Sequence, residues 1–149
     1  MRTKTTTTLL LLALALGACG RGQLPSAGAT DSRALRGTKW VVDTIVDGQS
    51  DSPAPAGAEA HVVFGDDARF NGSTGCNAMG GRSVVHEDTS TITFSEVITT
   101  KMACDDDRMR LERAVLGTLR GNVAYRIDAD VLRLDGSDGH GLRLRATAG

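Results

Sequence analysis

Apolar and polar residues alternate regularly through the last third of the chain. Val123, Tyr125 and Ile127 share one face of an extended segment, and the same spacing recurs at 132–134 and at 142–144. Period-two alternation is typical of antiparallel strands that bury one face. We therefore predict three strands here, and the segments between them, rich in aspartate and glycine, are expected to be turns.

Five shorter runs of apolar or β-branched residues precede this region. They cover residues 40–46, 61–64, 68–71, 83–85 and 91–97. We expect a loop over 49–59, which contains Pro53 and Pro55, and a tight glycine-rich turn over 72–81. Together with the C-terminal runs, the pattern predicts about eight strands.

A single helix is predicted after Cys104. Asp105, Asp106 and Asp107 offer N-capping oxygens and negative charge at its start. Apolar residues then recur at spacings of three and four, at 111, 114, 115 and 119, and Gly121 ends the pattern. The predicted fold class is mainly β (α+β): an antiparallel, barrel-like or curled sheet of about eight strands with one α-helix packed on it. We expect bulky residues to fill its interior, among them Val63, Phe70, Ile92, Phe94 and Leu132.

The N-terminus has the pattern of an export signal. Arg2 and Lys4 precede a nearly pure run of leucine and alanine from Leu9 to Ala18. As a helix this run would cover roughly half of a ~30 Å hydrocarbon core, which suits a signal peptide and not a lasting membrane span.

The signal ends in Leu16-Gly17-Ala18-Cys19, which resembles the bacterial lipobox. Cys19 is therefore the predicted lipidation site, and an ordinary secretory signal with an incidental cysteine is the alternative. We expect residues 1–18 to be removed, 19–36 to form a flexible tether, and 37–147 to fold as one domain. The protein would then be exported and anchored by its lipid to the extracytoplasmic face of the bacterial membrane.

The amino-acid composition argues against a nucleic-acid partner. The chain has 17 basic and 18 acidic residues, and only 3% of its residues are aromatic. A broad basic surface and an aromatic stacking platform are both missing, so we expect no nucleic-acid partner.

Two cysteines, Cys76 and Cys104, remain once Cys19 is set aside. In an oxidising compartment they are expected to form a disulfide, and two separate thiols are the alternative. Zinc is disfavoured because no further ligands stand at suitable spacing. A thiol at a helix N-terminus has a lowered pKa, so Cys104 is the one residue to consider for redox chemistry.

Other motifs favour turns over chemistry. The segment from Gly75 to Ser83 lacks the Gly-Lys-Ser/Thr ending of a phosphate loop, and the one from Asp135 to His140 lacks the ligand pattern of an EF-hand. The three histidines are dispersed, and no nucleophile elbow is present. We predict no catalytic, metal or cofactor-binding residues, and no enzymatic activity.

With these features in place, residues 37–145 resemble the META domain (HslJ-like) family of small envelope proteins. The similarity lies in Gly37-Thr38-Lys39-Trp40, Gly75-Cys76-Asn77, Thr100-Lys101-Met102-Ala103-Cys104 and the closing strands. The motif residues are Trp40, Gly75, Cys76, Asn77, Gly80, Thr100, Met102, Cys104 and Glu112. The resemblance implies a barrel-like fold with one helix and places Cys76 beside Cys104. It supplies no catalytic residue.

Three functions follow from these observations. The first is a non-enzymatic, membrane-anchored envelope lipoprotein that acts through contacts with an envelope protein or in envelope maintenance under stress. The second is a β-barrel that binds a small ligand or lipid. The third, favoured least, is a thiol-based redox protein that uses Cys104.

Overall fold

Nine strands and one helix account for most of residues 32–48 and 50–147, the part of the chain that this computed structural model describes. The strands are β1 (Lys39–Asp47), β2 (Ser50–Pro53), β3 (Ala60–Phe64), β4 (Arg69–Thr74), β5 (Ala78–His86), β6 (Thr91–Thr99), β7 (Gly121–Asp128), β8 (Val131–Asp135) and β9 (His140–Ala146). The helix, α1 (Asp106–Thr118), lies between β6 and β7.

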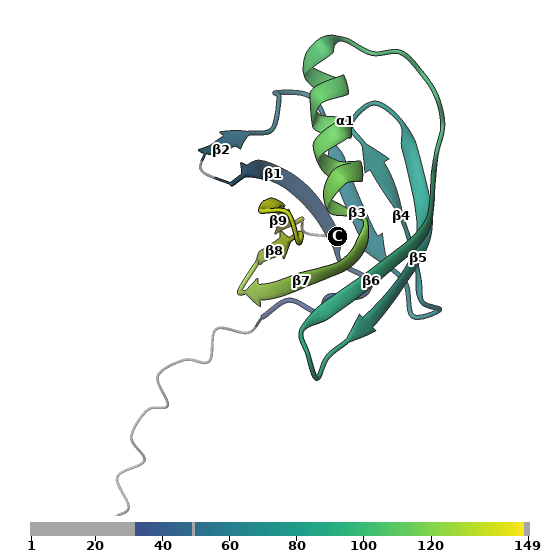
Figure 1. Cartoon of the computed structure of the whole chain (residues 1–149), viewed down its shortest axis with the longest axis vertical. Helices are drawn as coiled ribbons and strands as arrows, with labels where there is room; N and C mark the ends of the chain where they lie inside the picture. Colours follow the sequence, from purple (N-terminus) through teal and green to yellow (C-terminus); the bar gives the residue numbers. More distant parts are fainter. Residues whose placement is uncertain (1–31, 49, 148–149) are drawn as a thin grey trace, which may run out of the picture.

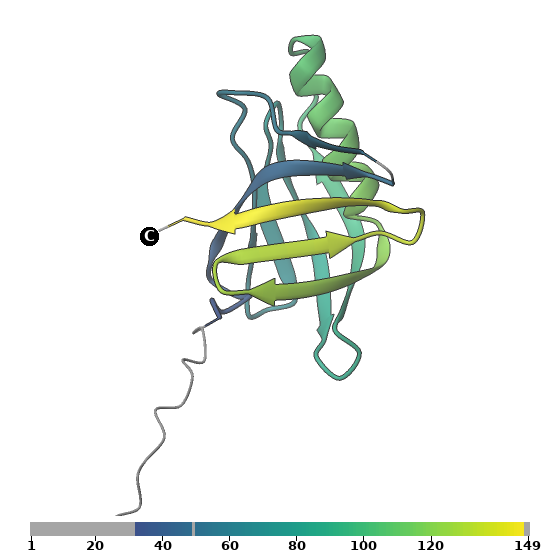
Figure 2. The same cartoon turned by 90° about the vertical axis from the view of Figure 1, so that its left-hand side faces the viewer.

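The strands close into an antiparallel barrel. From β3 to β9 each strand pairs with the next, and β1 joins the two ends of this series by pairing with both β3 and β9. Figure 2 shows β7, β8, β9 and β1 lying side by side in this order. Eight strands form the ring, and β2 adds to β1 outside it, at residues 44–47. The predicted fold class is confirmed.

Alternating apolar residues fill the barrel. Trp40, Ile92 and Leu132 are fully buried, and the Phe70 and Phe94 rings meet edge to face with centroids 5.4 Å apart. Of the five interior positions we predicted, four are buried, but Val63 is not. Its neighbours Val62 and Phe64 face inward instead, since successive residues of a strand point to opposite sides.

Helix α1 lies across one end of the barrel (Figure 1), where it packs against β9, β4 and β3. Its start is as predicted, because the Asp105 side chain accepts a hydrogen bond from the backbone N–H of Arg108 at 3.0 Å. Leu111, Val115 and Leu119 are buried on its inner face. The helix therefore closes the apolar interior and leaves its opposite face exposed.

Two segments differ from the prediction. Residues 50–53 of the expected loop form β2, as an antiparallel hairpin with β1. The expected glycine-rich turn shrinks to residues 75–77, because β4 and β5 extend into it from both sides. Gly72 shows why glycine suits a strand here, since a Cβ atom at this position would lie 2.0 Å from the His61 carbonyl oxygen.

Contacts with the barrel also include residues before 37. The backbone N–H of Arg33 donates to the Ala129 carbonyl at 2.9 Å, and the Trp40 indole donates to the Leu35 carbonyl at 3.0 Å. Residues 33–36 of the predicted tether thus lie against the barrel. The predicted signal peptide, Cys19 and the first part of the tether fall outside the described residues. Within those residues, no helix has the length and apolarity that a membrane span requires.

Candidate functional site

Most of the motif residues come together where the chain passes from β6 into α1. Gly75, Cys76 and Asn77 form the turn between β4 and β5, and the segment from Thr100 to Cys104 runs past this turn to the helix. Glu112 reaches the same place from α1. We call the hydrogen-bonded group of Thr74, Asn77, Thr100, Met102 and Glu112 the Asn77 junction.

The side chain of Asn77 is the centre of this junction and is only 2% exposed. Its Oδ1 accepts hydrogen bonds from the Thr100 hydroxyl at 2.8 Å and from the Met102 backbone N–H at 2.7 Å. Its Nδ2 donates to Glu112 Oε2 at 2.8 Å and to the Met102 carbonyl at 3.3 Å. Both donors and both lone pairs of the amide are therefore used, as a buried polar side chain requires.

Thr74 joins the turn to the helix and is fully buried. Its hydroxyl donates to Glu112 Oε2 at 2.5 Å and accepts the backbone N–H groups of Cys76 at 3.3 Å and of Asn77 at 2.9 Å. Thr74 is not among the residues predicted from the sequence. The available signal was a threonine at the start of a turn, where its hydroxyl can bond backbone groups two and three residues further on.

Cys76 and Cys104 form a disulfide, with their Cα atoms 6.0 Å apart and a sequence separation of 28 residues. The expected pairing is confirmed. It fixes the last residue before the helix cap to the turn that carries Asn77. Cys104 is consequently not the free thiol that redox chemistry by a single thiolate requires.

Two motif residues lie away from the junction, its turn and the disulfide. Trp40 belongs to β1 and packs in the barrel core. Gly80 lies in β5, opposite Ile98 of β6. The motif therefore combines a core position, a strand position and the junction.

An apolar surface borders the junction on its outer side. Ile98 is 73% exposed and Met102 is 60% exposed. A shallow depression of about 340 Å³ is lined by Ile98, Thr99 and Thr100 and by residues 78–80 of β5, and Met102 follows its lining two residues further along the chain. We call Ile98 and Met102, together with this depression, the Ile98–Met102 surface.

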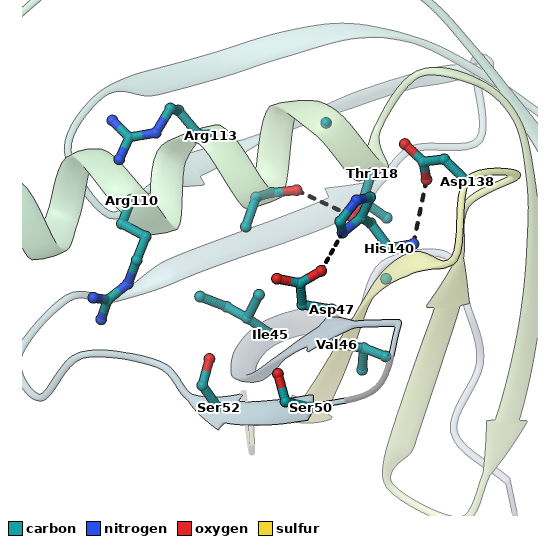
Figure 3. A pocket seen from close by; sticks show the side chains of 13 residues that line it. Ile45, Val46, Asp47, Ser50, Ser52, Arg110, Arg113, Thr118, Asp138 and His140 are labelled. Atoms are coloured by element: carbon teal, nitrogen blue, oxygen red, sulfur yellow. Dashed lines mark hydrogen bonds and ion pairs between the residues drawn. The ribbon is translucent and has the colours of Figure 1, made fainter.

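A groove of about 320 Å³ lies on another side of the helix, between α1, the β1–β2 hairpin and the start of β9 (Figure 3). Ile45, Val46 and Ala114 supply apolar lining, and Ser50 and Ser52 supply hydroxyl groups. We call it the α1–β2 groove.

Charged side chains surround the α1–β2 groove. His140 Nδ1 lies 3.0 Å from Asp47 Oδ1, and Asp138 Oδ1 accepts the His140 backbone N–H at 3.2 Å. On the helix, Arg110 lies 3.3 Å from Asp107. Arg113 forms no ion pair within the described part of the chain.

None of these groove residues was predicted from the sequence to bind a ligand, since they come from three segments far apart in the chain. The one local signal is the spacing of Arg110 and Arg113, which places both on neighbouring turns of an exposed helix face. Among the described residues, no three histidine, cysteine or acidic side chains come together as a metal site would require.

The fold and motif have relatives. The META domain model matches residues 33–148. No curated protein matches the chain.

Three solved structures share the fold at low sequence identity. A protein from Burkholderia xenovorans, solved by NMR, is 20% identical with a TM-score of 0.64, over 77% of this chain and 85% of its own. A second NMR structure is 16% identical with a TM-score of 0.57, over 72% of this chain and 87% of its own. The crystal structure of a DUF4847 family protein from Bacteroides vulgatus is 14% identical with a TM-score of 0.55, over 74% of this chain and 93% of its own.

Proposed function

The chain belongs to the META domain family, and on that premise we propose that it is a non-enzymatic, lipid-anchored protein of the bacterial envelope that works by binding another envelope protein. The lipobox-like segment ending in Cys19 supports the anchor. The tether that follows would leave the barrel free to contact partners beside the membrane.

The observation that carries the proposed protein contact is the way the Asn77 junction holds Met102. The backbone of Met102 is bound on both sides by the Asn77 amide, while its side chain is 60% exposed. A buried polar network is costly unless each of its groups is hydrogen-bonded, and a fully bonded network is rigid. Here the network holds the backbone of an exposed apolar residue in place. Such residues anchor protein interfaces when they sit on a rigid base.

The strand beside Met102 adds a second attachment point for a protein. β7 pairs with β6 only at residues 91–94, so the β7-facing edge of residues 95–99 has no strand partner in the described part of the chain. An unpaired edge offers backbone N–H and C=O groups to an extended segment of a partner. Ile98 lies on this stretch, which makes the Ile98–Met102 surface continuous with the open edge.

The other two candidate functions have less support. Side chains fill the barrel, so the interior does not favour the lipid-binding alternative, and a small ligand would bind outside it. The disulfide between Cys76 and Cys104 occupies the thiol that the redox alternative needs.

Site-specific photo-crosslinking in living cells tests the proposal. A photoreactive amino acid would replace Ile98 or Met102 in turn, and Arg126, an exposed residue on β7, provides the control position. We expect a discrete crosslinked protein from positions 98 and 102 and none from 126. Equal crosslinking at all three positions, or at none, would argue against the proposed contact surface.

A further inference from the structure

The α1–β2 groove separates its charges along its length. Arg110 and Arg113 line it from the middle of α1, while Asp47 and Asp138 line it nearer the end of the helix that carries Thr118 (Figure 3). The apolar residues Ile45, Val46 and Ala114 lie in the same groove. One end is therefore cationic, the other is acidic, and apolar lining joins them.

The acidic end has capacity for a cation. The Asp138 carboxylate bonds only a backbone N–H among the described residues, and Asp47 contacts one histidine nitrogen. A carboxylate has about four lone-pair positions, so both retain free acceptors. The last turn of α1 holds no basic residue, and the partial negative charge of a helix C-terminus adds to the two carboxylates.

The cationic end suits a carboxylate. A guanidinium group presents a planar set of donors that matches the two oxygens of a carboxylate. Arg113 has no ion-pair partner in the described part of the chain, so its donors are available. Arg110 forms an ion pair with Asp107 at 3.3 Å.

From this arrangement we propose that the α1–β2 groove binds a short peptide with free amino and carboxyl termini. The groove follows α1 from Arg110 to Thr118, which is about 12 Å at 1.5 Å per residue. An extended peptide advances about 3.5 Å per residue, so three residues match this length and a single amino acid is too short to reach both ends. The carboxyl terminus faces Arg110 and Arg113, the amino terminus faces Asp138, and an apolar side chain packs on Ile45 and Val46.

The proposed site does not depend on the lipid anchor or on the Ile98–Met102 surface. Its residues come from β1, β2, α1 and the β8–β9 turn, whereas Ile98 and Met102 come from β6 and the segment after it. Failure of one proposal therefore leaves the other standing.

Calorimetric titration of the full chain in detergent tests the groove with three probes: Ala-Leu-Ala, its N-acetylated form and its C-terminally amidated form. We expect the free peptide to bind about tenfold more tightly than either blocked form, because each block removes one charge-assisted contact. Equal affinity for all three peptides, or no binding of the free peptide, would overturn the proposal.

Two variants, each removing one charge, test which terminus of the peptide lies at which end of the groove. Arg113→Gln should weaken binding of the free and acetylated peptides and leave the amidated form unchanged, since only the first two carry a carboxylate. Asp138→Asn should weaken binding of the free and amidated peptides, which carry an ammonium group, and leave binding of the acetylated form unchanged. The asparagine amide oxygen can still accept the His140 N–H. Arg126→Gln, the same type of change at an exposed position on β7, is the control and should alter nothing.

Gly117→Leu tests the place of binding. A Cβ atom at Gly117 meets nothing within 4 Å, so a larger side chain extends into the groove without disturbing the helix. We expect this variant to keep or raise its melting temperature, since leucine favours a helix more than glycine does, and to weaken Ala-Leu-Ala binding about tenfold or more. Unchanged affinity in a folded Gly117→Leu protein would contradict binding in this groove.

Discussion

Asn77 binds Met102 through both backbone groups of that residue, accepting from its N–H at 2.7 Å and donating to its carbonyl at 3.3 Å. The side-chain amide thus takes the place that a neighbouring strand would have in a sheet. The segment between β6 and α1 is held without secondary structure of its own. This single contact explains why Asn77 and Met102, 25 residues apart, belong to one motif.

Replacing Asn77 by aspartate should be strongly destabilising. The change removes the Nδ2 donor and places a second carboxylate beside Glu112 Oε2, which now lies 2.8 Å away. We expect a loss of about 3 kcal/mol in the free energy of unfolding, measured by urea denaturation.

The Asn77→Asp, Glu112→Gln double variant is the matched control. A glutamine at 112 supplies a donor to the new carboxylate and removes the repulsion, so about half of the lost stability should return. If the double variant is no more stable than Asn77→Asp alone, Glu112 is not the partner that the junction requires.

The disulfide should contribute a large share of the stability. Joining residues 28 apart is worth about 3.5 kcal/mol through the lost entropy of the unfolded chain. The Cys76→Ser, Cys104→Ser variant should lose this amount in chemical denaturation. The wild type, unfolded and refolded under oxidising conditions without reductant, should show no loss. A double variant as stable as the oxidised protein would exclude the disulfide as a stabilising element.

Asp43 makes the barrel sensitive to acid. A bulge in β1 shifts the register with β9 between Val42 and Thr44, and the carboxylate of Asp43 there meets Arg143 at 2.9 Å and Arg145 at 2.8 Å. Partial burial opposes ionisation, but the hydrogen bonds from Thr44 and Arg143 and the two arginine charges outweigh it. They hold the pKa of Asp43 below its ordinary value of 3.8.

A lowered pKa means that the ion pairs stabilise the fold above pH 3.8 and that this gain is lost as the pH falls through the folded-state pKa. Asp43→Asn should therefore cost about 1 kcal/mol at neutral pH and progressively less under acid conditions. Denaturation curves of both proteins across this range check the prediction. A difference that stays constant into acid would show that the charge of Asp43 is not responsible.

Two glycines should respond to alanine in opposite ways. A Cβ atom at Gly81 would lie 2.9 Å from the Phe70 ring and 3.0 Å from the Ser95 carbonyl, whereas Gly117 faces open space. We expect Gly81→Ala to cost about 1–3 kcal/mol and Gly117→Ala to add up to about 1 kcal/mol through helix propensity. Thermal unfolding of the two variants measures both effects, and equal shifts would contradict the close packing assigned to β5 and β6.

The period of the apolar residues was enough to predict the barrel strands and the helix, because each strand buries one face and α1 buries one stripe. The disulfide followed from the number of cysteines in a chain that we predict to be exported. β2 could not be predicted in this way, since its residues 50–53 contain no apolar run and owe their extended conformation to pairing with β1. The role of Thr74 was also out of reach, because its hydroxyl acts through Glu112, 38 residues away.

The α1–β2 groove is the clearest case of a feature that local sequence does not encode. Asp47, Arg113 and His140 have ordinary surroundings in the sequence, and barrel closure alone brings β1 and β9 beside α1. Only the topology joins these charges into one site.

The intact mass of the protein from its own membrane fraction, alkylated before and after reduction, distinguishes a lipid-anchored, disulfide-bonded protein from a lipid-free one. We expect residues 1–18 to be missing, lipid mass to be present on Cys19, and Cys76 and Cys104 to be alkylated only after reduction. A lipid-free chain with a reactive Cys104 would contradict this expectation.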